Sequence, residues 1–235
     1  MIPLQRIGVT VPARNEASGI TACLRSLDAA AARSPRPVVV AVACDTCNDG
    51  TNTIARHYEP RSIQLVIVEG RWQSAGAARA AATDACRSLL VGDPATTWLA
   101  TTDADTTVPP DWLARQVTAA DRGADVILGI VELDAGTPTP LRDAFLDVYE
   151  RGVEHPHAHG ANFGIRGSTY AAAGGWNHAV TVGEEHDLLA RAIDIGATVL
   201  RTNELVVSTS GRTSSRVIGG FATDLGELAG GERVA

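Results

Sequence analysis

The sequence lacks the segments that tie a protein to a membrane or to a nucleic acid. It contains no uninterrupted apolar run of about 18 residues, and residues 1–6 show no charged-then-apolar leader. The formal net charge is -7 and the isoelectric point is near 5.3, and no cluster of basic side chains would attract a phosphate backbone or an anionic lipid surface. We therefore expect a cytoplasmic protein with no integral membrane segment and no nucleic-acid partner.

Cysteine is also scarce, with four residues at scattered positions: Cys23, Cys44, Cys47 and Cys86. This is too few for a disulfide scaffold, and it fits a reducing compartment. The C-x-x-C pair of Cys44 and Cys47 follows a predicted strand near a helix start, where a redox pair would lie, whereas a zinc site would need a second pair that the sequence lacks. We favour a third interpretation, in which two small residues flank a useful aspartate, Asp45.

The sequence does have enough apolar material for one large domain. Of 235 residues, 45% are hydrophobic and 20% are charged, a composition that can bury a core. Short apolar runs alternate with helical patterns along the first half, which predicts an α/β fold with right-handed crossovers and a mostly parallel sheet. The predicted strands cover residues 7–11, 38–43, 65–68 and 98–102, and the predicted helices begin near residues 20, 51 and 75.

The ends of these predicted elements carry the polar motifs. We expect Pro12 to end the first strand and Ser18 to cap the helix that follows it. In an open α/β sheet, the ligand crevice lies beyond the carboxyl ends of the strands. Each polar motif discussed below falls at such an end.

The most informative segment is residues 99–105 (LATTDAD), in which an apolar strand ends in two carboxylates one residue apart. Mg²⁺ and Mn²⁺ prefer oxygen ligands and keep positions open for substrate phosphates. Asp103 and Asp105 at the mouth of a sheet therefore indicate diphosphate chemistry. Because an acidic pair in a turn is often only solvated, this interpretation depends on the neighbouring motifs.

The neighbouring motifs occur in a particular order. Residues 11–17 (VPARNEA) and 44–51 (CDTCNDGT) follow the first two predicted strands, and residues 109–113 (PPDWL) follow the acidic pair. Three further segments are residues 160–166 (GANFGIR), 173–176 (AGGW) and 183–188 (GEEHDL). In order and spacing, these segments resemble the nucleotide-sugar domain of family-2 glycosyltransferases, which has the GT-A fold.

This resemblance extends over nearly the whole chain. It implies a single GT-A domain over residues 1–235, of the α/β class, with a Rossmann-like, mostly parallel central sheet flanked by helices. It also implies a nucleotide-binding half, residues 1–106, and an acceptor-binding half, residues 107–235.

The resemblance further implies that the nucleoside of the donor is held by Ala13, Arg14, Glu16 and Asp45. A carboxylate suits this role, since it accepts hydrogen bonds from the ring N–H groups of uracil or guanine. The same segments are also consistent with a simpler interpretation, in which Glu16 caps a helix and residues 45–50 form an Asx-type turn. We expect Asp49 to order that turn.

Arg79 corresponds to a basic residue that approaches the nucleotide in relatives. It is equally consistent with a solvated residue on a helix.

For the cation, the resemblance implies Mn²⁺ or Mg²⁺ with Asp105 as the direct ligand and Asp103 nearer the ribose and the metal-bound water. Such a cation neutralises the charge that grows on the departing nucleoside diphosphate. Some relatives add a histidine from a late loop, but residues 208–216 contain none. Arg212 or Arg216 would instead lie against the diphosphate when this loop closes, unless the segment is a plain surface loop.

For catalysis, direct displacement at the anomeric carbon needs a base that takes the proton of the acceptor hydroxyl. The candidates are Glu184, Glu185 and Asp187, which also suit the first turn of a helix for dipole reasons alone. By its place in the acidic motif of relatives, Glu185 is the base we choose. Glutamate stands here where aspartate is more usual, which leaves Asp187 and Glu184 as substitutes.

For the acceptor, we consider the alternating histidines of residues 155–159 and two positions further on. Alternating histidines bind transition metals and titrate near neutral pH. We favour acceptor or donor-phosphate contact for His159 and a solvated loop for the other two. Asn162 belongs to the segment that resembles the acceptor wall, and Trp176 suits either stacking on a sugar ring or the core.

Together these motifs predict a transferase that moves one sugar from a UDP- or GDP-linked donor to a hydroxyl acceptor, with inversion. A Gln-x-x-Arg-Trp motif, expected of processive synthases, is missing, as are the glycines of a nucleotidyltransferase loop after the first strand. The alternatives are a retaining GT-A transferase and a non-catalytic nucleotide-sugar binding protein.

Overall fold

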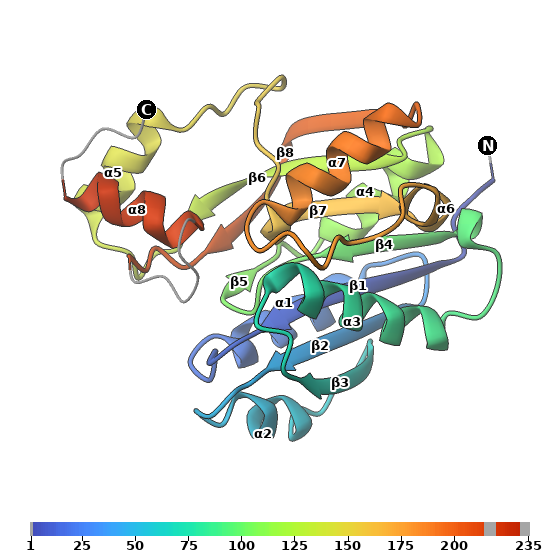
Figure 1. The fold of residues 1–235 in the computed structure, drawn as a ribbon, viewed down its shortest axis with the longest axis horizontal. Helices are drawn as coiled ribbons and strands as arrows, with labels where there is room; N and C mark the ends of the chain where they lie inside the picture. The colour runs from blue at the N-terminus through green and yellow to red at the C-terminus, as the bar shows by residue number, and fades with distance from the viewer. Residues whose placement is uncertain (1, 214–219, 231–235) are drawn as a thin grey trace.

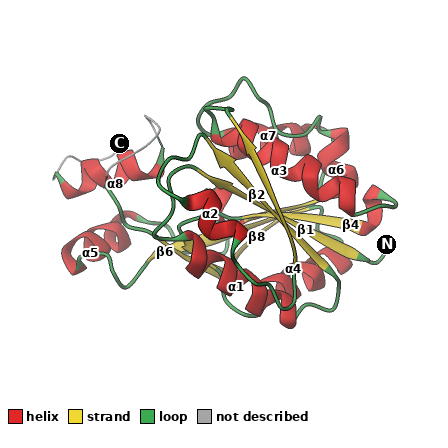
Figure 2. Ribbon diagram, turned by 90° about the horizontal axis from the view of Figure 1, so that it is seen from below, coloured by secondary structure: helices red, strands yellow, loops and turns green. Residues whose placement is uncertain are grey.

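The computed structural model describes residues 2–213 and 220–230. These residues form an eight-stranded sheet in the order β3-β2-β1-β4-β7-β6-β8-β5, with helices on both faces (Figures 1 and 2). The predicted fold class, a single α/β domain with a mostly parallel central sheet, is confirmed. The strands are β1 (Arg6–Ala13), β2 (Val38–Asp45), β3 (Gln64–Gly70), β4 (Thr97–Thr101), β5 (Thr106–Thr107), β6 (Val126–Leu133), β7 (Phe163–Arg166) and β8 (Val199–Thr209). The α-helices are α1 (Ile20–Ala32), α2 (Thr51–Arg56), α3 (Ala75–Leu89), α4 (Trp112–Asp121), α5 (Thr139–Val148), α6 (Gly167–Ala172), α7 (Glu184–Asp194) and α8 (Phe221–Ala229).

Four parallel strands, β3-β2-β1-β4, form the part of the sheet that the sequence predicted. All eight residues of β2 are buried, as expected for an inner strand with helices on both faces. Leu24 of α1 and Trp112 of α4 pack on one face, and Ala82 of α3 packs on the other against Ala41. Figure 2 shows the two helix layers, with α3, α6 and α7 opposite α1 and α4.

Two element ends differ from the sequence-based expectation. Pro12 lies within β1, paired with Ala43 of β2, and does not end the strand. The pairing of β1 with β4 stops at Thr10, so Pro12 lies where only one side of the strand is paired, a setting in which sheets tolerate proline. Gly19, not Ser18, is the N-cap of α1. A Cβ atom at Gly19 would lie 3.0 Å from the Ala104 carbonyl oxygen, so the helix begins directly against the acidic turn.

The second half of the sheet is mixed. β7 runs antiparallel to both β4 and β6, whereas β8 runs parallel to β6. The two-residue strand β5 pairs with the end of β8, and the hydroxyl groups of Thr106 and Thr209 lie 2.9 Å apart. This pairing joins the chain after Asp105 to the last strand of the sheet.

The helices α5 and α8 lie together at one end of the molecule, beyond the end of β6 (Figure 1). Their contact includes an edge-to-face pair of Phe145 and Phe221, with ring centroids 5.9 Å apart. Among the residues that the structure describes, no helix is long and apolar enough to span a membrane.

Candidate active site

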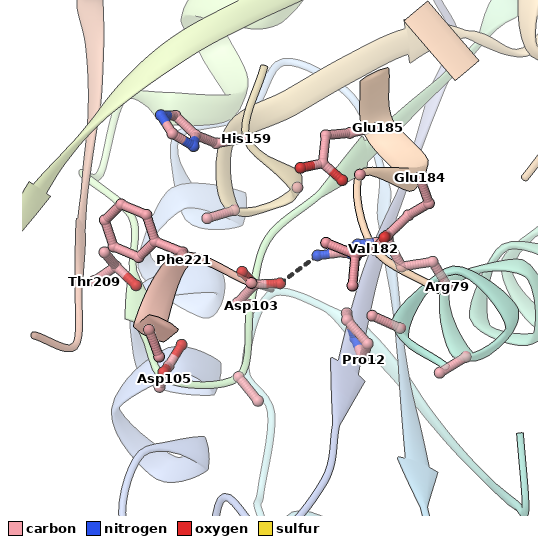
Figure 3. A pocket seen from close by; sticks show the side chains of 18 of the residues that line it. Pro12, Arg79, Asp103, Asp105, His159, Val182, Glu184, Glu185, Thr209 and Phe221 are labelled. Atoms are coloured by element: carbon pink, nitrogen blue, oxygen red, sulfur yellow. Dashed lines mark hydrogen bonds and ion pairs between the residues drawn. The ribbon is translucent and has the colours of Figure 1, made fainter. Parts of the chain in front are cut away.

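A cavity of about 650 Å³ opens at the carboxyl ends of the parallel strands, where the sequence predicted a ligand crevice. The first half of the chain contributes residues at or just after the ends of β1, β2 and β4, and the second half contributes loops and helix starts. Figure 3 shows Glu185 and His159 on one side, with Asp103 and Asp105 across from them. All the predicted donor-side residues line it: Ala13, Arg14, Glu16, Asp45, Arg79, Asp103, Asp105 and Arg212.

The acidic pair occupies the turn between β4 and β5. Asp105 is mostly buried, and burial raises the pKa of its carboxyl to about 7. Asp103 and Glu16 raise that pKa further, while the nearby Arg212 guanidinium lowers it. The turn therefore holds several carboxylates in a confined place, an arrangement that a cation stabilises.

Arg212 follows β8 and reaches back to this turn. Its Nη1 lies 2.8 Å from Oε1 of Glu16 and 3.0 Å from Oδ2 of Asp105. The loop before it is held by a hydrogen bond from the backbone N–H of Gly211 to the Thr137 hydroxyl. Arg212 thus lies against the acidic turn, its contact with a diphosphate stays a prediction, and Arg216 lies outside the described residues.

Asp45 ends β2 and faces the cavity as a fixed carboxylate. Its Oδ1 accepts hydrogen bonds from the Trp72 backbone N–H at 2.8 Å and from the Thr46 hydroxyl at 3.0 Å. The Asx-type turn nearby is made by Asp49, as predicted, because Asp49 accepts from the backbone N–H groups of Thr51 and Ala17. Asp45 itself is therefore not needed to form that turn.

The C-x-x-C pair packs the donor loop. Cys47 Sγ donates to the carbonyl of Ala13 at 3.3 Å and accepts from the backbone N–H of Asn15 at 3.4 Å. Cys44 is buried, and burial raises its pKa to about 12, which disfavours a reactive thiolate. All four cysteines are free. This geometry supports the interpretation of two small residues flanking Asp45.

Arg79 is buried and is not the solvated residue that the sequence allowed. Its Nη2 lies 2.5 Å from Oδ1 of Asp103, its Nη1 pairs with Glu184, and its Nε donates to the Thr101 hydroxyl at 3.2 Å. A Cβ atom at Gly160 would collide with the guanidinium, so glycine leaves the space that this arginine fills. Arg79 thus joins the end of β4 to the start of α7.

The three candidate bases at the start of α7 have different surroundings. Glu184 is buried against Arg79, and Asp187 pairs with Arg191 at 2.5 Å and does not line the cavity. Glu185 lines the cavity and forms no ion pair within the described part of the chain. Burial raises its pKa to about 7, with Arg79 lowering that value and Glu184 raising it. Of the three acids, Glu185 is therefore the one that lines the cavity without an ion pair to another described residue.

The histidine run is more ordered than the sequence suggests. His155 is 1% exposed, so a solvated loop is wrong for it, and His157 is half-buried. The rings of His157 and Tyr149 stack at 4.1 Å, because α5 brings the tyrosine against the run. His159 lines the cavity as predicted, with Nε2 at 2.8 Å from the Tyr149 hydroxyl. No group of three or more side chains able to hold a metal ion exists in the described residues.

Asn162 and Trp176 do not line the cavity, and their predicted acceptor contacts find no support in this geometry. The amide nitrogen of Asn162 donates to the carbonyls of Ile130 and Leu205, at 2.9 and 2.8 Å, and its oxygen accepts from the Trp112 indole. Asn162 thus fastens β6, β8 and α4 together. Trp176 is 5% exposed and belongs to the core, the second of the two roles that the sequence left open.

Sequence reasoning missed Phe221 and Val182, which also line the cavity (Figure 3). Phe221 is the first residue of α8, and Val182 belongs to the loop before α7. Neither residue stands in a motif. The available signal was compositional: Phe221 is one of only three phenylalanines in the chain.

Comparisons with solved structures find the same fold in other proteins. TarS 1–349 of S. aureus in complex with UDP-GlcNAc superposes with a TM-score of 0.69 at 15% identity, over 90% of this chain and 60% of that chain. The mannosyltransferase PcManGT of Pyrobaculum calidifontis in complex with GDP-Man and Mn²⁺ gives 0.65 at 20% identity, over 91% of this chain and 58% of that chain. This chain therefore spans about three fifths of the length of these relatives. A search of curated protein sequences finds no match.

The sheet, its helices and the cavity at the strand ends define a GT-A glycosyltransferase fold. The model of the family described as Glycosyl transferase family 2 matches residues 9–168, more than half of the chain. The protein belongs to that family.

Proposed function

We propose that the protein transfers one sugar from a nucleoside diphosphate sugar to a hydroxyl acceptor, with inversion at the anomeric carbon. The observation that carries this proposal is the arrangement of the cavity. Asp45, Asp103 and Asp105 line it at the strand ends. The carboxyl group of Glu185, which has no ion pair among the described residues, lies across the cavity from Asp103 and Asp105 (Figure 3). We also propose a cytoplasmic location, because four scattered cysteines fit a reducing compartment.

On the donor side, Asp45 is fixed by two hydrogen bonds to one of its oxygens, and it is placed to accept from a ring N–H of uracil or guanine. Arg14 and Ala13 continue this wall after β1. The relatives with solved donor complexes bind UDP-GlcNAc and GDP-Man, which is consistent with a UDP- or GDP-linked donor here.

The residues around the acidic turn fit a divalent cation. Their donors are carboxylate oxygens, which Mg²⁺ and Mn²⁺ prefer, and burial among acids raises the pKa of Asp105 even with the Arg212 guanidinium beside it. Asp105 would hold the ion, with Asp103 beside it. An ion held by these two carboxylates would take its remaining oxygen ligands from the diphosphate and water. When bound, the cation supplies positive charge to the departing nucleoside diphosphate.

On the acceptor side, Glu185 takes the proton of the attacking hydroxyl. A carboxylate with a pKa of about 7 is well matched to this task near neutral pH, because it is a stronger base than an ordinary glutamate and a substantial share of it is ionised. The new bond forms on the face opposite the diphosphate. Arg79 holds the neighbouring Glu184 and so fixes the start of α7, from which Glu185 projects.

A thermal-shift screen of UDP-, GDP- and dTDP-sugars, with and without Mn²⁺, tests this proposal. A ligand at about 100 times its Kd stabilises the fold by about 2.7 kcal/mol, enough to identify the donor. We expect Asp105→Ala to abolish the Mn²⁺-dependent part of the shift and to keep the nucleoside-dependent part.

Donor hydrolysis and transfer to an acceptor panel, followed by NMR of the product anomer, complete the test. An inverted anomer is the expected result. A product with retained anomeric configuration would show that the protein is a retaining GT-A transferase. Binding without turnover over the whole panel would make the protein a nucleotide-sugar binder.

A further inference from the structure

The cavity wall on the α5 and α8 side differs in chemistry from the donor side. His157, His159 and Phe221 line it, and Tyr149 lies behind them. The stacked Tyr149 and His157 rings are nearly parallel, with an interplanar angle of 7°, and the His159 and Phe221 rings meet edge to face with centroids 5.8 Å apart. We call these four side chains the aromatic wall.

The aromatic wall is built before any ligand arrives. Phe145 stacks on Tyr149 at 4.5 Å and meets Phe221 edge-on at 5.9 Å, so α5 and α8 hold the wall from behind. Because these rings are packed against one another, a second ring in the cavity would meet a fixed surface and lose little additional side-chain freedom.

No arginine lines this side of the cavity within the described residues, and the chain contains no lysine. Of the cavity arginines, Arg79 and Arg212 are paired with carboxylates, and Arg14 belongs to the donor side. The titratable side chains near the aromatic wall, besides its own histidines, are Glu185, Asp224 and His186. Among the described residues, a phosphate or carboxylate on the acceptor would therefore meet two acids and find no arginine partner.

The hydrogen bonds of Tyr149 favour one tautomer of His159. The Tyr149 hydroxyl accepts from the Val131 backbone N–H at 3.1 Å and lies 2.8 Å from Nε2 of His159, and we assign the hydroxyl proton to the bond with Nε2. The imidazole proton is then on Nδ1. Burial lowers the pKa of His159 to about 3, so the ring stays neutral and offers one uncharged N–H donor at the cavity wall.

We propose that the acceptor is an uncharged alcohol that carries a ring. The ring packs on Phe221 and His157, one of its oxygens accepts from Nδ1–H of His159, and the reacting hydroxyl lies toward Glu185. This inference rests on the proposed function and deepens it by naming the class of acceptor.

The first test uses a matched pair of ligands, benzyl β-glucoside and the same compound with a 6-phosphate. Binding to the full chain is measured by saturation-transfer NMR, which needs no donor turnover. We expect the neutral glucoside to bind at least about tenfold more tightly than its phosphate. Equal or tighter binding of the phosphate, or no binding of the neutral glucoside, would overturn the inference.

The second test changes the aromatic wall. Phe221→Leu keeps apolar volume but removes the ring, and we expect the affinity for benzyl β-glucoside to fall about three- to tenfold. His159→Asn keeps an N–H donor close to the place of Nδ1, and His159→Leu removes it. We expect the asparagine variant to bind at least about threefold more tightly than the leucine variant.

His57→Leu is the matched control, since His57 follows α2 and does not line the cavity. It should leave glucoside binding unchanged, and the thermal shift with the donor should be unchanged in every variant. If Phe221→Leu and both His159 variants bind the glucoside as the unaltered protein does, the aromatic wall is not the acceptor site. If the glucoside binds but no donor is bound or hydrolysed, the proposed glycosyl transfer is wrong. The aromatic wall would then still be a binding site for an uncharged ring.

Discussion

The two halves of the molecule supply the cavity in different ways. In the first half, β1, β2 and β4 are parallel neighbours, and each delivers its polar residues directly after the strand ends. In the second half, the lining residues come mainly from the histidine run before β7, the start of α7, the start of α8 and the chain after β8. The first half is therefore a regular sheet edge, whereas the second half is assembled by long-range packing.

This difference predicts that donor binding and chemistry separate between the halves. Glu185→Gln keeps the size of the side chain and removes the base. We expect kcat to fall about 10²- to 10⁴-fold, with the donor thermal shift unchanged. Asp187→Asn, in the same helix but paired with Arg191, is the control and should keep near-normal kcat. Normal transfer by Glu185→Gln would show that Glu185 is not the base.

Arg79 links the two halves, and its removal should have the largest effect on stability. Arg79→Met leaves Glu184 buried without its cation, which we expect to cost about 3–5 kcal/mol of unfolding free energy. The double variant Arg79→Met/Glu184→Gln should regain part of this loss in urea unfolding. Equal stability of the single and double variants would mean that the buried pair does not couple the halves.

Asn162 tests the internal anchoring of the second half alone. Asn162→Ala leaves the carbonyls of Ile130 and Leu205 without their donor, and we expect a loss of about 1–3 kcal/mol. Because Asn162 does not line the cavity, KM for the donor should stay within error. A large rise in the KM for the donor at unchanged stability would show that Asn162 contributes to donor binding.

The smallest expected effect is on the pH dependence of stability. Burial raises the pKa of both Asp105 and Glu185 to about 7, from 3.8 and 4.5. The folded state then binds protons more tightly than the unfolded chain, so this contribution is present at acidic pH and is lost as pH rises through about 7. In metal-free buffer, Asp105→Asn should flatten the decline in melting temperature between acidic and neutral pH. An unchanged pH profile of the melting temperature would show that the Asp105 carboxyl group is exposed to solvent in the folded state.

The sequence predicted the first half better than the second for a physical reason. Asp45, Asp103 and Asp105 follow apolar strands, and the geometry of a parallel sheet alone brings such positions together. Asp49 was correctly assigned to its turn because its hydrogen-bond partners are local.

The errors concern residues whose partners are remote in sequence. Asn162 stands in the motif at residues 160–166, but its partners lie on β6, β8 and α4. His155 looked solvated because proline follows it, whereas the fold buries it. The three acids of α7 were not separable, since only the positions of Arg79 and Arg191 distinguish them.

The pairing of β5 with the end of β8 limits where the chain can be shortened. The family match ends at residue 168, before Glu185 and before β8. A fragment cut there would leave Thr106 and Thr107 without the strand they pair with, and Arg79 without Glu184. The segment that looks most like a transferase is thus not a self-sufficient catalytic unit, because the last quarter of the polypeptide holds the acidic turn in place.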